Sequence, residues 1–191
     1  MPARCDMVDR KRAENAVREL LAAIGEDVTR EGLRETPERV ARMLEELTAG
    51  YADRAEEHLG KTFAESGSAL VIERDIAFSS TCEHHLMPFF GRVHIAYVPD
   101  GKVAGLSKLA RTVEVYARRL QLQERMNAQI ADAIYRHLAP KGVAVAVEAE
   151  HTCMTARGVK KTGSSTVTYA VRGEISDGVV AQLLSYTGER K

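Results

Sequence analysis

The sequence predicts an α+β fold in which an antiparallel four-stranded sheet carries two helices on one face, behind an N-terminal helical segment. Apolar residues follow helical spacing up to residue 50, alternate as in strands from residue 69, and return to helical spacing between residues 107 and 138. The resulting order of strand, strand, helix, helix, strand, strand favours an α+β layer, because both helices can cover the same face. We therefore divide the chain into residues 1–68, a helical segment with a linker, and residues 69–191, the main domain.

Two helices are predicted in the N-terminal segment. The first covers about residues 11–24, where the apolar positions share one face and Gly25 follows as a stop. The second runs from residue 36 to Gly50, and Thr36 followed by Pro37 is typical of an N-cap with proline at the first helical position. Residues 51–68 are polar, and we interpret them as a linker between the two parts of the chain.

Four strands and two helices are predicted in the main domain. LVIERDIAF and GRVHIAYV give the first two strands, and the turn residues 99–101 end the second. Ser107 is expected to cap a helix that runs to about residue 119, and a second helix ends before Pro140. VAVAVEAE and SSTVTYAV give the last two strands. A four-stranded sheet has two open edges, and pairing with neighbouring subunits would cover them.

The charge balance argues against two classes of partner. The chain has 27 basic and 27 acidic residues, so it produces no overall basic field that would attract nucleic acid or a membrane surface. The N-terminus has no apolar secretory signal, and no stretch approaches the roughly 18 apolar residues of a membrane span. Cys5, Cys82 and Cys153 are too few and too scattered for a disulfide framework, which indicates a reducing compartment. We expect a cytoplasmic protein.

A candidate metal site lies after the first predicted strand. Cys82 and His85 have the spacing of metal ligands, and Cys153, near the end of a later strand, is the candidate third ligand. Three protein ligands leave one position for water, which is typical of catalytic zinc. His84 and His151 then remain as acid–base candidates beside the metal. In the alternative interpretation, the cysteines are inert thiols and the histidines are ordinary hydrogen-bonded groups. The remaining histidines are expected to be exposed or at an interface: His58, His94 and His137.

Two further motifs have the chemistry to bind a nucleotide. In GLSKLAR, residues 105–111, Lys108 and Arg111 share a face at a predicted helix start, where Ser107 can donate and the helix N-terminus attracts anions. Arg157 is another candidate phosphate contact. In QLQER, residues 121–125, a carboxylate can accept two N–H bonds from a guanine edge. In the alternative interpretation, these motifs are a solvated helix start and a charged turn.

The chain resembles the GTP cyclohydrolase I family in four segments. They are CEHH at residues 82–85, GLSKLAR at 105–111, RRLQLQER at 118–125 and EAEHTCMTARGV at 148–159, and EGLRETPERVARML at 31–44 matches more weakly. The resemblance covers roughly residues 11–172. It implies a tunnelling fold, in which subunits join edge to edge into barrel rings and two stacked pentamers form a homodecamer. Residues 69–191 would then be the catalytic tunnelling-fold domain.

The resemblance also implies a reaction and the residues that perform it. Zn²⁺ would bind to Cys82, His85 and Cys153, with His84 and His151 as catalytic residues. Gln123 and Glu124 would contact the guanine, and the triphosphate would contact Ser107, Lys108, Arg111 and Arg157. The implied reaction converts GTP to 7,8-dihydroneopterin triphosphate and formate, as the first step of tetrahydrofolate and pterin biosynthesis. Zinc-bound water would attack purine C8 while His84 protonates N7, and ring opening, deformylation, Amadori rearrangement and ring closure would follow.

Three alternatives remain open. A relative that stops at the ring-opened formylamino pyrimidine would be recognised by product mass, and a non-catalytic GTP- or zinc-binding relative by binding without turnover. A nitrile-reductase relative on the same fold would use a cysteine nucleophile and a nicotinamide, without zinc. The chain departs from the family pattern at Met126 and after Gly173, where residues 174–191 are less familiar. An apolar stripe is still expected there from Val179, Val180, Leu183 and Leu184.

Overall fold

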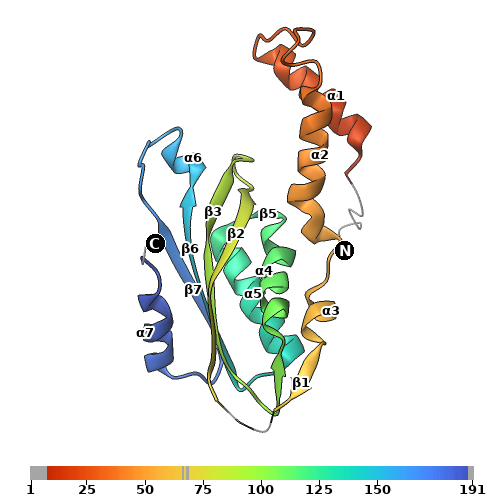
Figure 1. The fold of residues 1–191 in the computed structure, drawn as a ribbon. Coiled ribbons are helices and arrows are strands. Elements are labelled where there is room, and N and C mark those ends of the chain that lie inside the picture. The colour runs from red at the N-terminus through yellow and green to blue at the C-terminus, as the bar shows by residue number, and fades with distance from the viewer. Residues whose placement is uncertain (1–7, 66, 68, 189–191) are drawn as a thin grey trace.

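The computed structural model describes residues 8–65, 67 and 69–188, and it has an α+β architecture built on one curled sheet (Figure 1). The strand order is β5-β2-β3-β6-β7. The four long strands are antiparallel neighbours and confirm the four predicted strands: β2 (Val71–Cys82), β3 (Pro88–Val98), β6 (Gly142–His151) and β7 (Thr166–Gly173). The two-residue β5 (Leu120–Gln121), which was not predicted, pairs in parallel with the end of β2.

The N-terminal helices form a hairpin that projects away from the sheet (Figure 1). They are α1 (Arg10–Ala23) and α2 (Thr36–Thr48), as predicted. Arg10 makes two hydrogen bonds to the Glu45 carboxylate and so ties the two helices together. The predicted cap is wrong by one residue, because Glu35 occupies the N-cap and makes no side-chain cap bond. No helix among the described residues is long and apolar enough to cross a membrane.

The segment expected to be a linker contains regular structure instead. It forms the short 3₁₀ helix η1 (Ala49–Tyr51), the helix α3 (Ala55–Leu59) and the strand β1 (Thr62–Ala64). β1 pairs with β4 (Lys102–Ala104), and Ala55 and Leu59 are buried in the main core. Two apolar residues four apart are enough to attach such a short helix to the core. The domain boundary after residue 68 stays a prediction.

The helices α4 (Leu106–Ala117) and α5 (Gln123–Leu138) cover one face of the sheet, as predicted (Figure 1). The main core lies between these helices and the sheet, and its fully buried members include Val93, Ile95, Leu109, Val113, Ile130, Ile134, Val145 and Val147. Ser107 does not cap α4, because Gly105 occupies the N-cap and no side chain bonds there. α5 ends at Ala139, whose left-handed φ of 51° turns the chain before Pro140.

A third helix, α7 (Asp177–Ser185), covers the opposite face of the sheet (Figure 1). Ser176 caps it by accepting a hydrogen bond from the Val179 N–H. The expected apolar stripe is confirmed, since Leu183 is buried and its three apolar neighbours are half-buried. The strands present Ala96, Ala144 and Ala146 there, and such short side chains leave room for a helix to approach closely.

The expectation that His94 is exposed or at an interface is wrong with respect to exposure, because it is fully buried under the C-terminal segment. Its ring lies 6.0 Å from that of Tyr186, just after α7. Its Nδ1 accepts a hydrogen bond of 3.2 Å from the backbone N–H of Asp75, at an irregularity in the β2–β3 register. Burial lowers the pKa of His94 below its usual value. His58 and His137 are half-buried, and His58 contacts the carboxylate of Asp53 at 3.0 Å.

Replacing Leu183 by alanine is expected to lower the free energy of unfolding by about 3 kcal/mol, because it leaves a cavity between α7 and the sheet. The matched control is Leu20→Ala, since Leu20 is 62% exposed on α1. That change should cost about 0.5 kcal/mol or less. Urea denaturation followed by circular dichroism measures both values. Equal effects of the two substitutions would show that α7 does not pack on the sheet in solution.

Candidate active site

Two strand ends and one short helix bring together the predicted metal ligands. Cys82 is the last residue of β2, and His85 lies in the turn that leads to β3. Cys153 belongs to α6 (Thr152–Thr155), which directly follows β6. Because β3 pairs with both β2 and β6, the end of β2 and the end of β6 lie on either side of the start of β3. The turn is held by hydrogen bonds between Cys82 N–H and the Met87 carbonyl and between Leu86 N–H and the Cys82 carbonyl.

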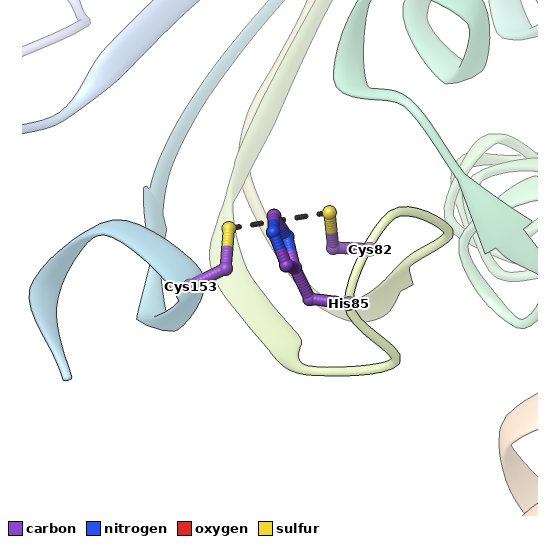
Figure 2. A group of neighbouring side chains, drawn as sticks. All are labelled: Cys82, His85 and Cys153. Carbon is purple, nitrogen blue, oxygen red and sulfur yellow. Dashed lines mark hydrogen bonds between the residues drawn. The ribbon is translucent and has the colours of Figure 1, made fainter. Parts of the chain in front are cut away.

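The geometry of this group fits a tetrahedral metal ion. The candidate ligand atoms of Cys82, His85 and Cys153 all lie within 4.8 Å of one another. Figure 2 shows their side chains pointing toward a common point, with the two sulfur atoms 4.0 Å apart. Zinc–sulfur bonds of about 2.3 Å in a tetrahedron place two sulfurs about 3.8 Å apart. The donor set of two thiols and one imidazole is also one that zinc prefers.

The two candidate thiols are close enough for one to affect the ionisation of the other. Burial raises the pKa of the Cys153 thiol, and the neighbouring Cys82 raises it further. Two thiolates at this distance repel each other, and a bound cation is what would let both ionise. Cys5, the third cysteine, lies outside the described residues.

The two candidate acid–base histidines have different surroundings. His84 is exposed, and its ring lies 6.2 Å from that of His85 with the planes at 90°. It is not part of the ligand group, as expected for a neighbour that points elsewhere. His151 is half-buried, and its Nε2 lies 2.9 Å from Oε1 of Gln123. Burial lowers the pKa of His151, and the nearby carboxylate of Glu124 partly opposes this.

Only some of the predicted nucleotide contacts lie near the metal ligands. Glu124 is exposed in the first turn of α5, and Arg157 follows α6, where its charge slightly opposes the burial that raises the pKa of Cys153. Gln123 is at the same end but is buried, with protein partners for both ends of its amide.

Of the other three predicted contacts, Ser107 and Lys108 lie in the first turn of α4 and Arg111 lies near its middle. The helix starts beside β4 and ends near β5, which pairs with β2 at Cys82 (Figure 1). The 12 residues of α4 correspond to about 18 Å of helix. That Lys108, Arg111 and Arg157 meet around one triphosphate therefore stays a prediction.

A comparison with known families decides what kind of protein carries this group. The family model of GTP cyclohydrolase I matches residues 13–185. The chain belongs to the GTP cyclohydrolase I family.

Curated relatives align with most of this GTP cyclohydrolase I family member. GTP cyclohydrolase 1 of Clostridium kluyveri is 58% identical over 166 residues, which are 87% of this chain and 90% of that protein. The Streptococcus sanguinis enzyme is 55% identical over 88% of this chain and 92% of its own. That of Carboxydothermus hydrogenoformans is 56% identical over 92% of each chain. Among solved structures, the apo archaeosine synthase QueF-Like is similar, with 20% identity and a TM-score of 0.48 over 59% of this chain and 100% of that chain.

Sequence reasoning assigned no role to three residues that support the site of this GTP cyclohydrolase I family member. Arg125 forms an ion pair with Glu83, which ties the turn bearing His84 and His85 to the start of α5. Phe89 stacks on the ring of His151, with centroids 4.5 Å apart and planes at 8°. Glu83 and Arg125 lie within the CEHH and RRLQLQER segments, so their positions in the sequence could have indicated a role at the site. Nothing in the sequence around Phe89 indicated a role at the site, apart from its position beside a predicted strand.

Proposed function

We propose that this chain hydrolyses GTP to 7,8-dihydroneopterin triphosphate and formate with a Zn²⁺ ion bound to Cys82, His85 and Cys153. The observation that carries the proposal is the convergence of these three ligand atoms within 4.8 Å in a member of the GTP cyclohydrolase I family. Three protein ligands leave a fourth position for water, as catalytic zinc requires. When bound, the ion would supply a nucleophile near neutral pH and polarise an oxygen of the substrate.

The chain's own groups would bind the purine and move protons around it. The exposed carboxylate of Glu124 can accept two N–H bonds from the guanine edge. His84, exposed beside the ligand group, can donate a proton to N7 and so make C8 more electrophilic. His151 is the second acid–base group, for the later ring-opening and rearrangement steps. Two waters enter in the two hydrolytic steps and one leaves on ring closure, so one water is consumed for each formate released.

The triphosphate site is proposed to be shared between subunits. Ser107 and Lys108 lie at the end of α4 away from the chain's own candidate metal ligands, and Arg111 lies near the middle of the helix. The same residues of a neighbouring subunit would therefore hold the triphosphate tail. Edge-to-edge pairing would bring this about, and the outer strand β7 carries the exposed apolar residues Val167 and Tyr169. We propose a homodecamer of two stacked pentamers, as the family resemblance implies.

GTP turnover and metal content measured on one preparation test the proposed function. We expect one formate for each pterin, detected by fluorescence after oxidation, and about one zinc per chain. Removing the metal with a chelator should abolish both products, and adding zinc should restore them. Formate without pterin would indicate a reaction that stops at a ring-opened pyrimidine, which product mass would identify. Nucleotide binding without any product from metal-replete protein would overturn the proposal.

A further inference from the structure

Gln123 is a buried polar residue whose amide is engaged at both ends. It begins α5 and is 2% exposed. Its Nε2 lies 3.1 Å from the Val147 carbonyl of β6, 2.9 Å from the Thr166 carbonyl of β7 and 3.1 Å from the Thr168 hydroxyl. Its Oε1 lies 2.9 Å from Nε2 of His151. Three acceptors share two amide hydrogens, so no N–H of this side chain is left for a purine.

These partners fix which way the amide faces. The backbone carbonyls of Val147 and Thr166 can only accept hydrogen bonds, so the atom of Gln123 that faces them must be the nitrogen that donates. The oxygen of Gln123 therefore faces His151 and can only accept. The Nε2 of His151 must then carry a hydrogen, which makes Nδ1 the unprotonated atom of the neutral ring.

The other atoms of the His151 ring are arranged consistently. Phe89 is fully buried and stacks in parallel on the ring, so it fixes the plane while Gln123 fixes the rotation. Nδ1 makes no hydrogen bond to any described residue, and it is not among the buried polar atoms without a partner. The ring thus turns Nε2 toward the protein and leaves Nδ1 open to solvent or a ligand.

We propose that Gln123 is a positioning residue that holds His151 in the Nε2–H form and presents Nδ1 to the substrate. This rests on the proposed function, since it assigns Nδ1 as the atom that exchanges protons with the reacting nucleotide. It differs from the purine contact that the family resemblance implies for Gln123. A wrongly oriented imidazole loses most of its value as an acid or base, because the proton is on the wrong atom.

Solid-state ¹⁵N NMR of zinc-loaded protein labelled at histidine reads the tautomer directly. His151 is assigned by comparison with His151→Asn, at about pH 8, where a histidine is largely neutral. We expect a protonated Nε2 and an unprotonated Nδ1 in the wild-type protein. A protonated Nδ1 with an unprotonated Nε2 would overturn the proposal. Because this needs no variant of Gln123 and no turnover, it is independent of the proposed function.

Kinetics of Gln123→Met test the consequence for catalysis. Methionine keeps the length of the side chain but cannot accept from His151, so both tautomers should appear and kcat should fall about 100-fold. KM for GTP and zinc content should stay near the wild-type values. A raised KM with unchanged kcat would instead show that Gln123 contacts the purine.

The matched control is Gln121→Met. Gln121 is also 2% exposed. Its amide nitrogen donates to the Tyr116 carbonyl and to Gln129, and its oxygen accepts from Arg125, without any contact to His151. It should lose comparable stability while the His151 resonances stay as in the wild-type protein. Equal losses of kcat in both variants, together with an unchanged His151 tautomer in Gln123→Met, would reduce Gln123 to a structural role and overturn the proposal. If wild-type protein failed to turn over GTP, the proposed function would fail while the tautomer result still stood.

Discussion

Cys153→Ser is expected to lose zinc and GTP hydrolysis together, with activity falling to the level of the blank. The substitution removes one of the three candidate ligands, whose atoms lie within 4.8 Å of one another. A serine hydroxyl is a much weaker ligand for zinc than a thiolate. The remaining cysteine and histidine then form an incomplete site, since catalytic zinc normally has three protein ligands. Zinc per chain by mass spectrometry and formate release, measured on the same sample, give both values.

His84→Ala is the control that separates a ligand from an acid–base residue. His84 is exposed and lies outside the ligand group, so this variant should keep its zinc while kcat falls about 10²- to 10⁴-fold. The contrast excludes a general loss of folding as the explanation for Cys153→Ser. Zinc loss in His84→Ala would show that His84, and not only His85, binds the metal.

Mixing two inactive variants is expected to restore activity, because the proposed site takes its halves from different subunits. One variant is Cys153→Ser, which lacks the metal half, and the other is Lys108→Ala/Arg111→Ala, which lacks the phosphate half. In a random assembly of equal amounts, about a quarter of the sites combine an intact half from each chain. Coexpression with two different tags, followed by purification through both, yields the mixed oligomers. Their GTP turnover should therefore approach about a quarter of the wild-type rate.

A second mixture makes this result specific. Cys153→Ser and His85→Ala both damage the metal half, so every metal centre in their mixed oligomers carries a defect and no activity should return. If the two halves belonged to one chain, the first mixture would be equally inactive, because every chain would carry a damaged site. Inactivity of the first mixture would thus contradict the shared site, while zinc binding by Lys108→Ala/Arg111→Ala would be unaffected.

Much of the fold was predictable because periodicity records which side of each element is buried. The helices α1, α2, α4 and α5 and the strands β3 and β6 form where they were predicted. However, α1 has no buried residue, and β6 is buried on both of its faces over most of its length. The periodicity of apolar residues does not show which other element packs against a given face of the sheet. His94 alternates with an apolar face and was therefore expected to be exposed or at an interface, yet α7 and Tyr186 bury it. The elements missed in residues 51–68 are short, and their burial depends on distant partners such as β4.

The candidate ligands were predictable for a chemical reason. A thiol and an imidazole at C-x-x-H spacing, with a second thiol near a strand end, are the residue types that zinc prefers as ligands. His84 lies outside the candidate ligand group, although it is the chain neighbour of His85. Gln123 was different, because its amide partners come from β6 and β7, up to 45 residues away in the chain. No local pattern indicates that its oxygen faces a histidine.

By itself, the sequence determined the main helices and strands, the three candidate thiol and imidazole ligands, and the family, since these depend on side-chain chemistry and on short spacings. Only the tertiary structure decided how far apart the motifs lie. The 12-residue helix α4 holds Lys108 in its first turn, whereas Cys82 pairs with β5 beyond the other end of the same helix. The same packing turned Gln123 inward, because the carbonyls of β6 and β7 need a donor and a buried amide must satisfy both of its ends.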